Sequence, residues 1–181
     1  NQFQASGRLE VRFVEITNSE EVIAAMKGAA LVWLESPTNP CLDVADLPAF
    51  ERRDGIDVLY RGESADILIV SVGAMAAICV EAAAQAYREG VGVTVVDPLW
   101  VKPLPSALLT MAQRYSAVVV VEDGIRHSGI GSSVAEMFRD AGLNIPVHSI
   151  GVPLTFIEHA KRGEILNDLG ITAQRIARSL V

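Results

Sequence analysis

The chain has 181 residues, half of them hydrophobic, and a formal net charge of −7. This length can bury one sizeable core, or one domain and part of another, but no run reaches the roughly 20 apolar residues that cross a bilayer. The acidic balance argues against a nucleic-acid partner, and we expect neither a signal peptide nor a membrane contact. Two cysteines, Cys41 and Cys79, are too few for a disulfide framework, so we expect buried thiols and a cytoplasmic location.

The first part of the chain alternates between strand and helix patterns. Residues 11–16 (VRFVEI) predict a strand, residues 18–27 predict a helix, and residues 29–35 (AALVWLE) predict a second, buried strand. The stretch SPTNP at 36–40 excludes both helix and central strand, because it holds two prolines within four residues. A polar stretch at 43–55 then predicts an irregular junction.

From residue 57 to the end of the chain, strand and helix patterns alternate regularly. The predicted strands are rich in valine and isoleucine, and they cover residues 57–60, 65–73, 91–97, 116–123 and 145–151. The predicted helices cover residues 74–90, 105–115, 132–141, 162–169 and 172–180. Strands separated by helical segments are typical of βαβ units, so we predict an α/β fold with an open, mostly parallel sheet.

The segment 118–136 (VVVVEDGIRHSGIGSSVAE) places glycines between a predicted strand and a predicted helix, as phosphate-binding loops do. However, Gly129 and Gly131 come several residues after the strand, and the third small position of the dinucleotide fingerprint is a valine. The lysine of a P-loop and the spacing of a nucleophile elbow are also missing. We therefore expect the glycines to allow a tight turn and a close helix, with Ser132 or Ser133 as the helix cap.

The other candidates in the chain are acidic residues and histidines. Glu122 ends a predicted strand, where open α/β sheets place ligands and interfaces; the alternative is that it accepts hydrogen bonds from the loop backbone. Glu122 and Asp123 point to opposite faces, so they do not form an acid/base pair. His127 is a candidate functional residue of the glycine loop, whereas His148 fits a core or edge position and His159 a solvated or capping one. Their spacing predicts no metal site.

Three motifs, at 92–105 (GVTVVDPLWVKPLP), 118–136 and 156–177 (FIEHAKRGEILNDLGITAQRIA), carry a family resemblance. Residues 49–181 resemble the C-terminal domain of the 1-deoxy-D-xylulose-5-phosphate synthases, which are thiamine-diphosphate enzymes. The resemblance implies an α/β fold with an open, mostly parallel three-layer sheet of the transketolase C-terminal type. It also implies a domain that supports its neighbour and adds to a dimer interface.

The same resemblance implies no catalytic residue in this chain. In the family, thiamine diphosphate and Mg²⁺ lie between upstream domains, whose motifs the sequence does not contain. The parent reaction condenses pyruvate with glyceraldehyde 3-phosphate on the way to isoprenoid precursors. We therefore expect no cofactor for this chain alone, and a second copy or the missing synthase domains as partners.

Residues 8–48 resemble another family, the pyridoxal-phosphate enzymes of cysteine and methionine metabolism, such as cystathionine γ-synthase. The motif is VWLESPTNPCLDVADLP at 32–48. The resemblance implies that Asp46 pairs with the pyridine nitrogen of the cofactor and that Asn39 lies near its ring. The Schiff-base lysine and the phosphate loop of that family are absent, so both are vestigial positions.

The two resemblances predict two parts, a βαβ fragment at 1–48 and a transketolase C-terminal-like domain at 49–181. The chain then reads as a chimera, whether natural, engineered or misassembled. Because the short N-terminal fragment cannot form a core alone, we expect it to share one with the main sheet or with a second copy. Three functions stay open: a non-catalytic structural domain, part of an active synthase when upstream domains are present, and a residual pyridoxal-phosphate binder.

Overall fold

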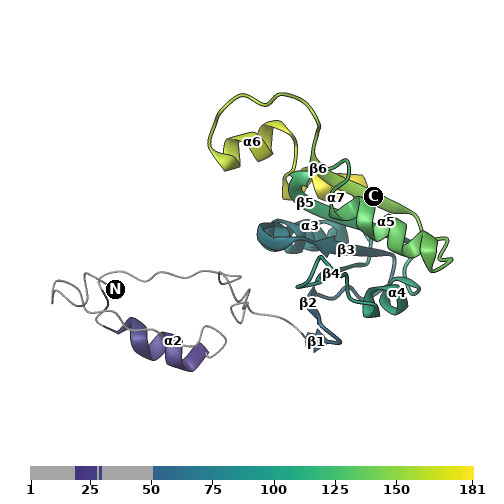
Figure 1. Cartoon of the computed structure of the whole chain (residues 1–181), viewed down its shortest axis with the longest axis horizontal. Coiled ribbons are helices and arrows are strands. Elements are labelled where there is room, and N and C mark those ends of the chain that lie inside the picture. Colours follow the sequence, from purple (N-terminus) through teal and green to yellow (C-terminus); the bar gives the residue numbers. More distant parts are fainter. Residues whose placement is uncertain (1–18, 28, 30–50) are drawn as a thin grey trace. The chain divides into compact units, whose positions relative to one another are not determined.

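A computed structural model describes residues 19–27, 29 and 51–181 of the chain (Figure 1). The chain divides into two units, residues 1–48 and residues 49–181. In the first unit, helix α2 (Ser19–Met26) confirms the helix predicted at 18–27. Its two glutamates in the first turn favour the positive end of the helix dipole. The strands predicted at 11–16 and 29–35 lie outside the described residues, apart from residue 29.

The second unit contains a six-stranded sheet in the order β1-β2-β4-β3-β5-β6. The strands are β1 (Glu51–Arg53), β2 (Ile56–Tyr60), β3 (Ile67–Ser71), β4 (Val93–Asp97), β5 (Ala117–Ile125) and β6 (Val147–Val152). Strands β4, β3, β5 and β6 are mutually parallel, whereas β1 and β2 are antiparallel to their neighbours. The prediction of an open, mostly parallel sheet is confirmed.

Helices cover both faces of this sheet, because its inner strands are apolar on both sides. Helices α3 (Ala76–Arg88) and α7 (Ala173–Leu180) pack on one face, and α4 (Ala107–Ala112) and α5 (Ile130–Asp140) pack on the other. A 3-10 turn, η1 (Gly73–Met75), precedes α3, and α6 (Arg162–Asp168) precedes α7. Successive residues of β5 alternate between the two cores, with Val119 in one and Val120 in the other. The predicted three-layer α/β fold is therefore present.

Helix α3 shows how the sequence pattern produces this packing. Its buried residues Cys79, Ala82, Ala83 and Ala86 recur at helical spacing and present small side chains to the sheet. Gly90, with φ of +85°, follows the end of the helix as predicted. Burial raises the pKa of the Cys79 thiol to about 12, so this cysteine is an inert core residue.

The hairpin of β1 and β2 corrects the prediction of an irregular junction at 43–55 for residues 51–55, whereas residues 43–50 lie outside the described residues. The turn residues Asp54 and Gly55 have φ of +49° and +78°, as a two-residue hairpin turn requires. The Arg52 guanidinium donates to both oxygens of Asp57, its cross-strand neighbour, at 2.6 and 2.9 Å. Within the described ranges, no helix is long and apolar enough to cross a membrane.

Candidate functional site

The sequence candidates of the second unit meet at one edge of the sheet. Because β3, β4, β5 and β6 are parallel, their carboxyl ends lie along the same side, which we call the carboxyl edge. Open α/β sheets bind ligands at this edge. Glu122 lies here in β5, followed by the loop that carries His127 and Gly129 and by Gly131 in the first turn of α5.

Glu122 is a buried carboxylate that caps helix α5. Only 4% of the residue is exposed. Its Oε2 accepts a hydrogen bond from the Ile130 backbone N–H at 3.0 Å, and its Oε1 accepts one from the Gly131 N–H at 3.0 Å. These are the first two residues of the helix, whose N–H groups have no partner within the helix. Of the two roles predicted for Glu122, the structure shows the anchoring of the loop backbone.

The glycines of the loop are needed because the chain closes tightly around this carboxylate. A Cβ atom on Gly129 would lie 2.5 Å from Glu122 Oε1 and would also clash with the Ile125 carbonyl oxygen. On Gly131 it would lie 2.8 Å from the Ser149 Cβ, on the neighbouring strand β6. Close approach is what the sequence predicted for these two glycines.

Gly151, which sequence reasoning did not single out, and Ser132 complete the arrangement. Gly151, on β6, also packs against Glu122, since a Cβ there would lie 3.1 Å from the Glu122 Cγ. Ser132 is not the helix cap that was predicted: α5 begins two residues earlier, and the Ser132 hydroxyl accepts a hydrogen bond from the Ser128 N–H at 3.1 Å. The cap comes instead from Glu122, which no local pattern identifies.

This geometry answers whether the loop can hold a phosphate. The positive end of the α5 dipole and its first N–H groups attract anions, but the protein's own carboxylate already takes that place. A phosphate here would have to displace Glu122 or lie beside its negative charge. The loop therefore serves as an internal anchor between β5 and α5.

Asp123 and the three histidines face outward. The Arg162 guanidinium donates to Asp123 Oδ2 from Nε at 3.3 Å and from Nη2 at 2.8 Å, and so ties α6 to the end of β5. His127, His148 and His159 are all exposed. Within residues 19–27 and 51–181, no three acidic, histidine or cysteine side chains gather as metal ligands would. Asp123 is exposed whereas Glu122 is buried, so these adjacent carboxylates lie in different surroundings.

Asp97, at the carboxyl end of β4, is the carboxylate with a raised pKa at this edge. Burial raises its pKa above the ordinary 3.8, and the neighbouring Asp57 carboxylate raises it further, while the Leu99 N–H donates to Asp97 Oδ1 at 2.8 Å and opposes the shift. The folded state thus binds the Asp97 proton more tightly than the unfolded chain does. Stability is lost as the pH rises from the unfolded pKa through the folded one.

We therefore expect Asp97→Asn to stabilise the fold near neutral pH. Asparagine keeps an acceptor oxygen for the Leu99 N–H but carries no charge to desolvate. Urea unfolding at several pH values checks this: the variant should be the more stable at about pH 7, and the two proteins should converge at about pH 4. If the variant and the wild-type protein differed equally in stability at both pH values, the charge of Asp97 would not be the cause.

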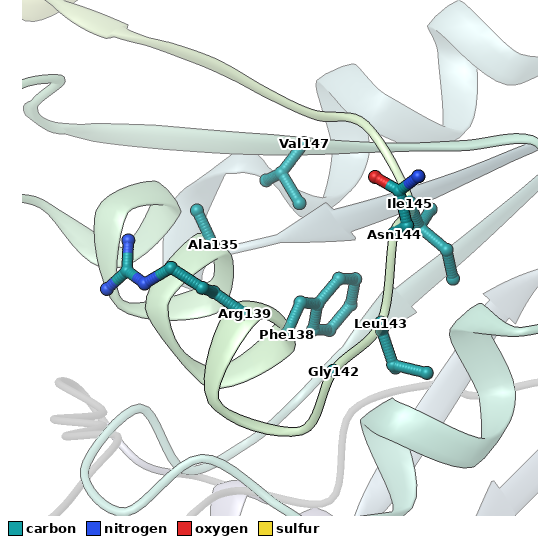
Figure 2. Close-up of a pocket in the computed structure, with 8 residues that line it drawn as sticks. All are labelled: Ala135, Phe138, Arg139, Gly142, Leu143, Asn144, Ile145 and Val147. Carbon is teal, nitrogen blue, oxygen red and sulfur yellow. The ribbon is translucent and has the colours of Figure 1, made fainter.

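A shallow depression of about 410 Å³ lies at the opposite end of α5, where the helix leads into β6 (Figure 2). Phe138 and Val147 form part of its apolar lining. Arg139 is the one charged residue of the lining. Its Nη2 lies 3.8 Å from Glu136 Oε1, and its Nε lies 3.9 Å from Asp140 Oδ1. The depression therefore brings together no set of groups for acid/base or nucleophilic chemistry.

Comparison with known proteins identifies relatives of this chain. The family model "Transketolase, C-terminal domain" matches residues 57–176. A 1-deoxy-D-xylulose-5-phosphate synthase of Mycobacteroides abscessus is 46% identical over 75% of the chain and 22% of its own length. A 1-deoxy-D-xylulose-5-phosphate synthase 2 of Kitasatospora griseola is 46% identical over 96% of the chain and 26% of its own length. A solved split-gene transketolase, an inactive beta4 tetramer, is 31% identical with a TM-score of 0.64, over 76% of this chain and 46% of that one.

The comparisons give no support to the predicted pyridoxal-phosphate fragment at 8–48. The alignment with the Kitasatospora griseola protein leaves only 4% of the chain uncovered, so it includes most of these residues. Asn39 and Asp46, the vestigial cofactor positions, lie outside the described residues. The family model covers about two thirds of the sequence, and the described fold agrees with it, so the chain belongs to the transketolase C-terminal domain family.

Proposed function

We propose that this chain is the C-terminal part of a 1-deoxy-D-xylulose-5-phosphate synthase and acts in it as a structural domain without catalytic residues of its own. The chain spans between about a fifth and a quarter of the length of the curated relatives reported above. In this proposal the rest of the enzyme binds thiamine diphosphate and Mg²⁺ and condenses pyruvate with glyceraldehyde 3-phosphate.

The observation that carries the structural role is the capping of α5 by Glu122. A diphosphate needs free N–H donors or cations, and the best donors at the carboxyl edge are already bonded to this carboxylate. Among the described residues, no three acidic, histidine or cysteine side chains gather as metal ligands would. We therefore assign the cofactor to the rest of the enzyme and derive no chemical step through it.

Two comparisons support this proposal further. The split-gene transketolase structure is that of an inactive tetramer, which is consistent with a C-terminal chain that needs other domains for activity. The extent of the Kitasatospora griseola alignment favours residues 1–48 as part of the same synthase chain. The chimera, with its residual pyridoxal-phosphate site, is the weaker candidate, because no comparison supports it.

The proposal predicts an inactive chain that becomes part of an active enzyme when the missing domains are added. The chain alone, with thiamine diphosphate, Mg²⁺ and both substrates, should give no product and no cofactor-induced rise in melting temperature. Adding the Kitasatospora griseola synthase 2 without the quarter that matches this chain should give turnover. That truncated synthase without the chain is the control. Product formation by the chain alone would contradict the proposal.

A further inference from the structure

Large hydrophobic side chains lie exposed at the carboxyl edge. Phe156 is 93% exposed and Leu154 is 71% exposed, both in the segment that connects β6 to α6, and Ile125, the last residue of β5, is 49% exposed. We call these three residues the carboxyl-edge patch. Trp100, which is 50% exposed, follows β4 at the same edge. Ile125 is paired with Val152, two residues before Leu154, and neighbouring exposed apolar side chains commonly mark an interaction surface.

Leu154 and Phe156 belong to a connection that is fixed at both ends. At its start, Ile125 pairs with Val152 on β6, and the Arg126 N–H donates to the Val152 carbonyl at 2.8 Å. At its far end, Arg162 binds Asp123 at 2.8 Å, and α6 buries Leu166 in the core. Between these anchors, the chain arches away from the sheet (Figure 1). The exposure of Leu154 and Phe156 therefore belongs to a held loop rather than to a free terminus.

The size of the patch indicates what kind of partner covers it. Three side chains of this size, 49 to 93% exposed, present roughly 400 Å². A stable interface between separate proteins needs about 800 Å² on each partner. A domain joined to its partner by the chain meets it at an effective concentration that reaches about millimolar, so a smaller contact suffices. The area thus favours a partner in the same polypeptide over a free-standing dimer of this chain.

We propose that the carboxyl-edge patch docks on an apolar surface of the upstream domains of the same synthase. This inference rests on the proposed function, and it adds the surface by which this domain contacts the remainder of the enzyme. The relatives are about four to five times as long as the part that this chain matches, so such a partner is joined to it in them. Phe156, the most exposed of the three, is the expected centre of the contact.

Binding to the truncated Kitasatospora griseola synthase 2, without the quarter matched by this chain, tests the docking. We compare the full chain, the double variant Leu154→Ser/Phe156→Ser, and the control Tyr87→Ser by titration calorimetry. Tyr87 is 45% exposed but lies at the end of α3, away from the carboxyl edge. We expect the double variant to bind at least tenfold more weakly and the control to bind like wild type. The double variant should keep the melting temperature of the wild-type chain, because its replaced side chains are exposed. Tyr87→Ser also removes the hydrogen bond between Tyr87 and Glu63, so a lower melting temperature of the control does not bear on docking.

The outcomes separate this inference from the proposed function. If the wild-type chain binds and restores turnover but the double variant binds equally well, the patch is not the contact, and only the inference fails. Because the patch is smaller than a stable interface between separate proteins needs, the titration extends to about millimolar chain. If the wild-type chain then neither binds nor restores turnover, both the proposed function and the inference fail. Light scattering of the chain alone completes the test: a dimer that the double variant breaks would make a second copy the occupant and overturn the inference.

Discussion

Glu122→Ala is expected to lower the free energy of unfolding of the second unit by about 3 kcal/mol, since each buried N–H left unsatisfied costs about 1–3 kcal/mol. The side chain is buried, and its two oxygens accept hydrogen bonds from Ile130 and Gly131. Alanine leaves both N–H groups without this acceptor and removes a negative charge from the positive end of α5. Urea unfolding followed by circular dichroism measures the loss.

Two variants show whether this loss arises from the cap. Glu122→Gln keeps one acceptor oxygen, so it should lose about half as much as the alanine variant. Asp123→Ala removes the neighbouring carboxylate, which is exposed and forms a surface ion pair with Arg162, and should cost less than about 1 kcal/mol. Equal losses at positions 122 and 123 would show that the α5 cap is not the source of the stability.

Gly131→Ala is the second substitution with a large expected effect, a loss of about 2–3 kcal/mol from overpacking. The new Cβ would lie 2.8 Å from the Ser149 Cβ and would overlap the Ser149 hydroxyl, inside a buried contact between α5 and β6. Either the helix shifts from the sheet or Glu122 loses its bond to the Gly131 N–H. The midpoint of urea unfolding measures the effect.

A matched glycine and a second-site change make this prediction specific. A Cβ atom added to Gly163, in α6, would meet no neighbouring atom within 4 Å, so Gly163→Ala should leave stability unchanged or raise it by up to about 1 kcal/mol. Adding Ser149→Ala to Gly131→Ala removes the hydroxyl from the clash and should restore part of the loss. Additive effects of the two changes would place the cause elsewhere than in the contact of α5 with β6.

Most elements of the second unit follow from local pattern, and the exceptions have physical reasons. The valine-rich strands and the alanine-rich helix α3 have apolar residues at the spacing that predicts which side chains are buried. Helix α5 begins two residues earlier than predicted because Glu122, eight residues before Ile130, supplies its cap. The strand β1 was missed because its three residues are charged, although the Asp54-Gly55 turn beside it is a typical hairpin signal.

The candidate site was only partly predictable. Glu122, Gly129 and Gly131 stand out in sequence because they lie in a glycine-rich strand-to-helix connection. The contact of Gly151 with Glu122 and that of Arg162 with Asp123 join positions 29 and 39 residues apart, and no spacing rule reports such pairs. The pyridoxal-phosphate resemblance rested on one short motif without its lysine, and chemistry that depends on several distant residues cannot be inferred from one of them.

The charged strand β1 has a consequence for the behaviour of the protein in concentrated solution. A sheet that ends in a long apolar strand offers unpaired backbone groups on which other chains can aggregate. Among the described residues, that side of the sheet ends in Glu51, Arg52 and Arg53, whose hairpin turn fixes their register. A foreign strand would have to desolvate these charges to pair with it. A charged last strand in the described part of the sheet therefore disfavours fibril growth from this end.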